Sequence, residues 1–305
     1  MKRLFWSVQT ALFYLFTLAA AAIPGSLIPP AGKAIGGLMA LFLRKRRGIA
    51  VDNIRRALPF MTKHPDWTCP LDAPEAIARE LFRHLGISLL EVSRLYHGGG
   101  DAIIGNVEIR GRENFEHART RHKGIIFVTG HCGNWELMAL AFARAYDEPV
   151  SVVARRQNNP YLNVMVEKMR LHYRNTVIYK DGGLRQMLGV LKKGGIIGIL
   201  ADQAVFPEDG ALIDVLGRKA WASKAPVIIG RKTGAALIPI FIHREGCRNV
   251  ITLYPEYELG SDTSEQGVQR DVQALSRYVE NFAVAHPSEW YWVHRRWKRA
   301  GEPSC

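Results

Sequence analysis

Short apolar segments alternate with longer amphipathic segments from Val107 onward, and this alternation limits the possible folds most strongly. Runs of β-branched and apolar residues are typical of buried strands, and the segments between them have the 3.6-residue spacing of helices. Strands joined by crossover helices form a mostly parallel sheet with helices on its faces. We therefore expect an α/β domain with a mixed, mostly parallel sheet flanked by helices. The predicted strands lie near 107–110, 125–130, 150–155, 176–179, 196–201, 236–242 and 250–254. The predicted helices lie near 135–146, 160–174, 184–193, 224–233 and 264–285.

The length and composition set wider limits. A chain of 305 residues can form one large α/β domain or two small ones, and because no repeat or long linker separates two halves, we expect one. The formal net charge of +13 indicates anionic partners, which could be nucleic acid, phospholipid headgroups, phosphorylated sugars or an acidic protein. Four scattered cysteines without a Cys-x-x-Cys pair argue against a zinc site and a disulfide framework.

The amino-terminal segment 4–23 contains no charged residue and is long enough to cross the hydrocarbon core of a bilayer as a helix. A membrane helix is the favoured interpretation, and a cleaved signal peptide or a buried core helix are the alternatives. A second apolar stretch, 34–43, ends in the basic cluster 44–47. Because basic loops stay in the cytoplasm, we predict a membrane anchor (helix or hairpin) over 1–43 and a cytoplasmic domain over 44–305.

Two further segments combine basic residues with a membrane-like context. The basic helix predicted near 44–60 could be an ordinary solvated face, but beside an apolar anchor it favours contact with anionic lipid. The carboxyl-terminal segment 290–298 mixes tryptophans with cations, which suits either single-stranded nucleic acid or a membrane interface. The anchor favours the membrane interface, so we predict an anionic membrane surface as a partner and no nucleic acid.

The segment 125–136 carries the strongest candidate for chemistry. It changes from a strand pattern to a helix pattern across two glycines, and His131 lies in the turn between them. Ligands of open α/β sheets bind at the carboxyl ends of strands, where a helix amino terminus offers free N–H groups. Glu136 lies one helical turn further on, so we expect it to orient the imidazole of His131 as a general base. Cys132 as a nucleophile is disfavoured because neighbouring side chains point to opposite faces, and no Gly-x-Ser-x-Gly elbow is present.

Other polar residues follow predicted strands at the same edge of the sheet. Arg155 and Arg156 could bind phosphate through their guanidinium forks, or they could be ordinary surface arginines. Arg185 follows a glycine-containing turn that could bind an anion, although a plain turn is the simpler interpretation. Asp202 follows the strand near 196–201, where the sequence alone would make it a loop or helix cap.

The segment His131-Cys132-Gly133-Asn134-Trp135-Glu136 resembles the histidine-x4-acidic signature of the glycerolipid and lysophospholipid acyltransferase superfamily. Within it, the chain most resembles the bacterial lipid A biosynthesis late acyltransferases, the lauroyl and myristoyl transferases. The similarity covers nearly the whole chain, in the family's order. The supporting stretches are 44–47 with 53–59, 155–160, 191–195 through 202–203, and 290–298.

The resemblance implies the acyltransferase type of α/β fold and transfer of a fatty acyl chain from acyl carrier protein to a hydroxyl of a phosphorylated glycolipid, a lipid A precursor of the Kdo-lipid IVA type. His131 and Glu136 would be catalytic, and the backbone N–H groups around 133–135 could hold the oxyanion. The predicted substrate-binding residues are Asn134, Arg155, Arg156, Arg185 and Asp202, and the resemblance slightly favours Arg156 over Arg155.

No metal or organic cofactor is expected, because a thioester is already activated. The implied location is the bacterial inner membrane, with the catalytic domain facing the cytoplasm. Two alternatives remain open. One is an acyltransferase for another glycolipid, such as a phosphatidylinositol mannoside, and the other is a non-catalytic membrane protein that binds anionic lipid.

Overall fold

The computed structural model describes residues 1–301 and contains a seven-stranded sheet in the order β1-β9-β8-β2-β5-β3-β4. Strands β8, β2, β5, β3 and β4 are parallel, β9 runs antiparallel to β8, and β1 pairs in parallel with β9. The fold is therefore the mixed, mostly parallel sheet that the sequence predicts. Its strands are β1 Val107–Arg110, β2 Ile125–Thr129, β3 Val150–Ala154, β4 Thr176–Tyr179, β5 Ile196–Leu200, β8 Ala236–Glu245 and β9 Arg248–Leu253.

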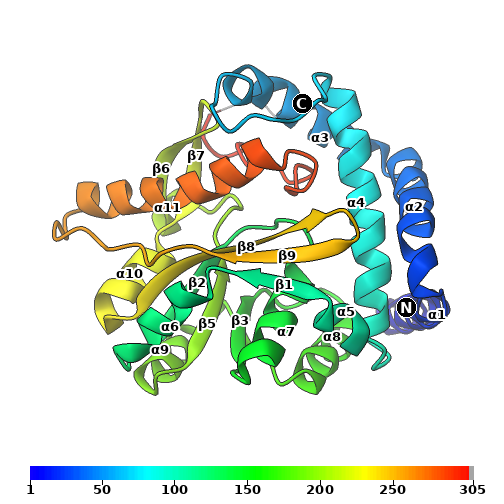
Figure 1. Cartoon of the computed structure of the whole chain (residues 1–305), viewed down its shortest axis with the longest axis horizontal. Coiled ribbons are helices and arrows are strands. Elements are labelled where there is room, and N and C mark those ends of the chain that lie inside the picture. The colour runs from blue at the N-terminus through cyan, green and yellow to red at the C-terminus, as the bar shows by residue number, and fades with distance from the viewer. Residues whose placement is uncertain (302–305) are drawn as a thin grey trace.

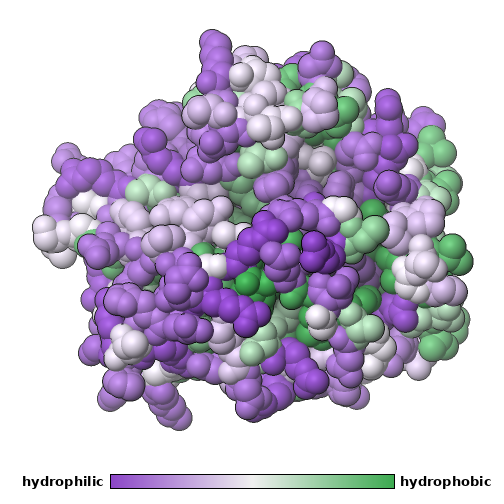
Figure 2. Space-filling view, in the orientation of Figure 1, coloured by the Kyte–Doolittle hydropathy of each residue, from purple (hydrophilic) through white to green (hydrophobic). Residues whose placement is uncertain are grey.

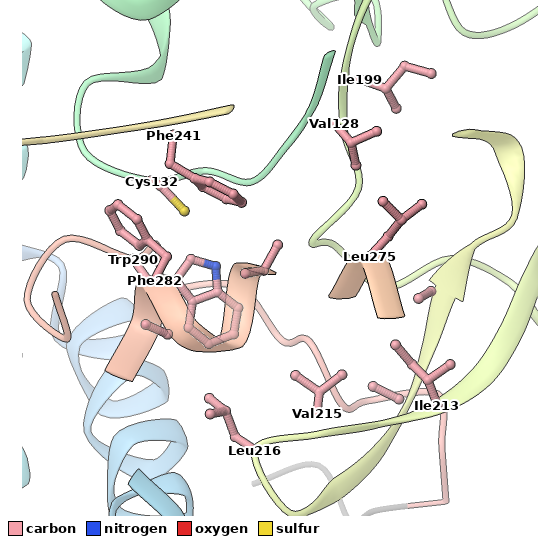
Figure 3. Close-up of a cluster of buried hydrophobic side chains, with 14 of the residues drawn as sticks. Val128, Cys132, Ile199, Ile213, Val215, Leu216, Phe241, Leu275, Phe282 and Trp290 are labelled. Carbon is pink, nitrogen blue, oxygen red and sulfur yellow. The ribbon is translucent and has the colours of Figure 1, made fainter. Parts of the chain in front are cut away.

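Helices cover both faces of this sheet, and α11 and α7 lie on opposite sides of it in Figure 1. One buried cluster joins the sheet to α3, α9, α10 and α11, and a second joins it to α6, α7 and α8. The first cluster is drawn in part in Figure 3, where Val128 and Ile199 lie across from Leu275. The helix bounds are α3 Arg44–Met61, α4 Pro74–Leu95, α5 Asp101–Gly105, α6 Arg112–Thr120, α7 Trp135–Tyr146, α8 Pro160–His172, α9 Leu184–Lys192, α10 Ala225–Thr233 and α11 Glu265–Ala285.

All seven predicted strands and five predicted helices of the α/β part are present, with ends shifted by at most three residues. The hairpin of β6 (Gly210–Val215) and β7 (Arg218–Ser223) was not predicted, and neither was α6. The hairpin turn uses Leu216 and Gly217, both with positive φ of 49° and 77°. A leucine rarely occupies that conformation, so Gly217 is the one usual turn residue at the centre of this hairpin.

The amino-terminal helices pack around the long helix α4 (Figure 1). They are α1 (Lys2–Ala21) and α2 (Ile28–Phe42), joined by the 3-10 turn η1 (Gly25–Leu27). Gly36 of α2 meets α4 so closely that an added Cβ would lie 2.1 Å from the carbonyl oxygen of Phe82. Gly86 of α4 meets Gly32 in the same way, so only glycine allows this contact between backbones.

One described helix, α1, is long and apolar enough to cross a membrane. In Figure 2 hydrophobic atoms gather at the edge where Figure 1 places α1 and α2. Residues 1–43 are nevertheless in contact with the rest of the chain, because α1 and α2 both pack on α4.

The carboxyl-terminal tryptophans lie in the core. Trp290, Trp292 and Trp297 are each at most 3% exposed, and Figure 3 shows Trp290 grouped with Cys132 and Phe282. Asn53 of the basic helix α3 donates hydrogen bonds to the carbonyl oxygens of Trp292 and His294, at 2.8 and 2.9 Å. The prediction of a membrane-interface belt is therefore wrong for these tryptophans, because their indole rings fill the interior.

Candidate active site

The turn that carries His131 is held tightly in place. It connects the end of β2 to the start of α7, and Gly133 within it has a φ of 52°. A Cβ on Gly133 would lie 2.2 Å from the carbonyl oxygen of Ile242, so no other residue fits. The N–H of Gly133 donates to the carbonyl oxygen of Glu289, and the N–H of Tyr291 donates to that of His131. The turn is thereby tied to the segment that follows α11.

His131 is oriented by Asp202. The two residues meet because β5 lies beside β2 in parallel register, so the loops after both strands leave the sheet together. His131 Nδ1 lies 2.7 Å from Oδ1 of Asp202, and the backbone N–H of His131 donates to Oδ2 at 2.9 Å. Trp290 Nε1 donates to the same Oδ2 at 3.0 Å. With Nδ1 as donor, Nε2 is left as the basic nitrogen, which is the arrangement of a general base with its orienting carboxylate.

The charges of this pair support each other. Burial opposes ionisation of Asp202, but the imidazolium charge and the hydrogen bonds from His131 and Trp290 outweigh it and lower the pKa of the carboxyl group. Burial also lowers the pKa of His131, but the charge and hydrogen bond of Asp202, with a smaller effect of Glu136, raise it above its usual 6.5. The ring is 21% exposed, so a substrate can reach it.

Glu136 does not take the place that the sequence predicts for it. Its carboxylate binds Arg170 of α8 through two hydrogen bonds, of 2.6 Å to a terminal nitrogen and 3.2 Å to Nε. Within residues 1–301 no hydrogen bond joins Glu136 to His131. The prediction that Glu136 orients the imidazole is therefore wrong in this structure. Asp202 is the hydrogen-bond partner of His131 Nδ1, and Arg170 is the partner of the Glu136 carboxylate.

A cavity of about 700 Å³ opens beside His131. Its wall is largely apolar and is formed by residues of β2, β3 and β5 together with α7. A volume of this size is typical of sites for small ligands. Besides His131, the charged and amide side chains that line it are Glu136, Arg155, Gln157, Arg170, Lys180, Asp181 and Gln203. The side-chain nitrogen of Gln203 lies 3.2 Å from His131 Nε2, next to the atom that would take a proton.

Only one of the three arginines predicted to bind substrate lines the cavity. Arg155 lines the cavity and donates to Asn158 at 3.0 Å, whereas the guanidinium of Arg156 lies over the ring of Tyr179, 3.8 Å from its centroid. Arg185 is exposed and is not one of the residues that line the cavity. Asp202 binds His131 and is too deeply buried to face a substrate.

Asn134 also has a structural position instead of the predicted substrate-binding one. It is 3% exposed, and its side-chain oxygen caps α7 by accepting from the N–H of Leu137. Its side-chain nitrogen donates to Glu91 at 2.8 Å, and Glu91 is held by two hydrogen bonds from Arg244, at 2.7 and 2.9 Å. The buried ion pair of Glu91 and Arg244 therefore helps to hold Asn134, and with it the turn that carries His131.

Two residues at the cavity were missed by the sequence reasoning. Arg170 lies in a helix and its partner Glu136 is 34 residues away, so no local pattern connects them. Tyr291 lines the cavity, and its ring centroid lies 5.9 Å from that of His131. The described residues contain no group of three or more His, Cys, Asp or Glu side chains suited to hold a metal ion.

A histidine with its carboxylate partner, placed at a strand end and facing an apolar cavity, is the arrangement of an α/β enzyme that uses a general base on a substrate with an apolar part. Residues 3–299 match the family model described as bacterial lipid A biosynthesis acyltransferase, and the chain therefore belongs to that family.

Two curated relatives come from Escherichia coli (strain K12). The chain is 24% identical over 278 residues to the lipid A biosynthesis palmitoleoyltransferase, and this match covers 88% of the chain and 83% of the relative. It is 23% identical over 285 residues to the lipid A biosynthesis lauroyltransferase, and this match covers 92% of the chain and 88% of the relative. A solved structure, the 1-acyl-sn-glycerophosphate acyltransferase PlsC from Thermotoga maritima, superposes with a TM-score of 0.36 at 14% identity, covering 76% of this chain and 97% of that one.

Proposed function

We propose that this acyltransferase transfers a fatty acyl chain from acyl carrier protein to a hydroxyl of a lipid A precursor of the Kdo-lipid IVA type. The observation that carries the proposal is the His131–Asp202 pair at the head of an apolar cavity with cations at its polar rim. An aliphatic chain suits the apolar wall, and Arg155 and Lys180 suit the phosphates of an anionic glycolipid.

In this mechanism His131 acts as the general base. Its Nε2 removes the proton of the acceptor hydroxyl while the oxygen attacks the thioester carbonyl and forms the new C–O bond. Collapse of the tetrahedral intermediate breaks the C–S bond, and the imidazolium returns the proton to the leaving sulfur. Asp202 stabilises the imidazolium in between, through the 2.7 Å hydrogen bond at Nδ1. The products are an ester and the free thiol of the carrier.

The oxyanion requires hydrogen-bond donors near the same turn. Gly133, included in the sequence-based proposal, is not available because its N–H already donates to the carbonyl oxygen of Glu289. The N–H groups of Trp135 and Glu136 belong to the first turn of α7, where no intrahelical acceptor exists, and both residues line the cavity. We assign the oxyanion to this helix start, where the helix dipole also favours negative charge.

The amino-terminal helix supports attachment to a membrane. The outer face of α1 exposes a stripe of large apolar residues, namely Leu4, Phe5, Val8, Leu12 and Leu15. Polar groups of α1 bind the rest of the chain instead: Thr17 meets His97 at 2.9 Å, and Asn159 donates to the side chains of Gln9 and Thr10 at 2.9 and 3.1 Å. A surface helix in water has the opposite arrangement, so lipid is the medium that suits this face.

We therefore propose that the protein is attached to the bacterial inner membrane, with its catalytic part in the cytoplasm. Asn159 also caps α8, which follows the Arg155 segment at the rim of the cavity. Contact between α1 and α8 would hold the rim near the bilayer surface, where a lipid acceptor resides.

Mass spectrometry of lipid A tests this function. A bacterium that lacks its own late acyltransferases should gain one acyl group per lipid A when it produces this protein, and should gain none with His131→Ala. An unchanged lipid A mass, with the protein present in the membrane, would refute the proposed acceptor.

A further inference from the structure

The central sheet splits at the level of the active site. Pairing between β3 and β5 ends at Val152 with Gly198, although β3 continues to Ala154 and β5 to Leu200. Over the same residues β3 still pairs with β4, and β5 still pairs with β2. The two strands therefore diverge, and the cavity is lined by residues of both strands above the point of divergence.

The cavity reaches one face of the sheet beside α7. Phe127, Gly198 and Val152 lie in one row across β2, β5 and β3, so their side chains share a face. Phe142 of α7 packs on Phe127 with ring centroids 4.7 Å apart, and Ala139 lines the cavity from the same helix. Gly198 has no side chain to fill the middle of the row, which leaves space for a ligand. We call this part the α7 arm.

The cavity also reaches the opposite face. Val153 and Ile199 follow Val152 and Gly198 by one residue, so their side chains point to the other side of the sheet. There the cavity is lined by Met187 of α9, by Ser223 at the end of β7 and by Ala225 of α10. Ile199 and Met187 belong to a different buried cluster from Phe127 and Phe142. We call this part the α10 arm.

We infer that the two arms hold two aliphatic chains at once, the donor acyl chain in one and a chain of the acceptor in the other. The inference rests on the proposed function, and it takes the acceptor hydroxyl to be carried by a 3-hydroxyacyl chain of the lipid A precursor. Such a hydroxyl reaches His131 only if its own chain also enters apolar space. The split between β3 and β5 provides that second space, and both arms meet beside His131.

The position of Lys180 indicates which arm holds the chain of the acceptor. Lys180 lines the cavity just before α9, which forms part of the α10 arm. A phosphorylated headgroup bound by Lys180 would therefore place its acyl chain in the α10 arm. The α7 arm, with Phe127, Ala139, Phe142 and Gly198 as its wall, receives the donor chain.

Matched substitutions test this assignment. Ala139→Leu and Ala225→Leu add the same three carbon atoms to opposite arms, and Ala274→Leu adds them to α11, outside the cavity. Acyl transfer is measured with a series of acyl carrier protein donors and a series of acceptors that differ in chain length. Ala139→Leu should lower kcat/KM for the longest donors about tenfold or more relative to short donors, and leave the order of acceptors unchanged. Ala225→Leu should show the reverse pattern, and Ala274→Leu should show neither.

A binding measurement separates this inference from the proposed function. Native mass spectrometry of the wild-type protein with dodecanoate should show two bound chains, and each arm variant should show one. A single chain on the wild type would overturn the inference even if transfer to lipid A is observed. Shifts of donor preference in both arm variants, or in neither, would also overturn it. Absence of transfer by the wild type with two chains bound would instead reject the proposed function.

Discussion

Replacing Asp202 by asparagine should remove most of the turnover while leaving the protein folded. The carboxylate accepts three hydrogen bonds, two from His131 and one from Trp290. Asparagine keeps the shape but has one acceptor oxygen and no charge, so at least one of these donors loses its acceptor. A charge-assisted hydrogen bond is worth about 1.5 to 3 kcal/mol, and loss of the correct tautomer adds to that. We expect kcat to fall by about two to four orders of magnitude, with KM for both substrates little changed.

The same substitution should also change how kcat depends on pH. His131 must be neutral to act as a base, so activity is lost as pH falls through its pKa, which Asp202 raises above 6.5. Removing the negative charge of Asp202 lowers the pKa of His131. The acid limb of the kcat profile of Asp202→Asn should therefore move to lower pH.

Glu136→Gln is the matched control, because it also changes a nearby carboxylate to an amide. Glu136 contributes the smallest of the effects that raise the pKa of His131, and it binds Arg170 instead of the ring. Glu136→Gln should cost less turnover and move the acid limb less. The assay is transfer of a labelled acyl group from acyl carrier protein to a lipid A precursor between pH 5 and 9. Near-normal turnover of folded Asp202→Asn, or a larger pH shift in Glu136→Gln, would refute the reasoning.

Three further changes test other parts of the structure. Arg155→Ala should raise KM for a phosphorylated acceptor about tenfold to a hundredfold, whereas Arg156→Ala should not, because only Arg155 lines the cavity; equal losses on a dephosphorylated acceptor would contradict a phosphate contact. Gly133→Ala should lower the free energy of unfolding by at least about 1 kcal/mol, owing to its positive φ and the nearby carbonyl of Ile242, and an unchanged Tm would contradict this. Leu12→Glu on the outer face of α1 should release part of the protein from sedimented membranes, whereas Leu184→Glu, at a similarly exposed leucine of α9, should not.

The sequence predicts the sheet well because each strand is a local signal. Buried parallel strands are apolar runs with helical segments between them, and this pattern is readable without knowing the strand order. The position of His131 at the carboxyl end of a strand follows from the same pattern. The hairpin of β6 and β7 does not, because its turn places Leu216 at a positive φ.

The carboxylate that binds His131 could not be predicted from a local sequence pattern. Glu136 is close in sequence, whereas Asp202 becomes a neighbour only because β5 inserts beside β2 in the sheet. The sequence marked Asp202 as a candidate but could not assign its contact. The same limit explains Trp290, since a mixture of aromatic and basic residues does not show which of them are buried.

The most direct test is to mix the purified protein with acyl carrier protein charged with a fatty acyl chain and with a Kdo-lipid IVA type acceptor, and to record the mass of the lipid product. We expect the acceptor to gain the mass of one acyl group with the wild-type protein. With His131→Ala or Asp202→Asn we expect the same gain to accumulate at least about a hundredfold more slowly under the same conditions. Equal gain with these variants, or no gain with the wild type on any acceptor hydroxyl, would contradict the role of the His131–Asp202 pair in acyl transfer to lipid A.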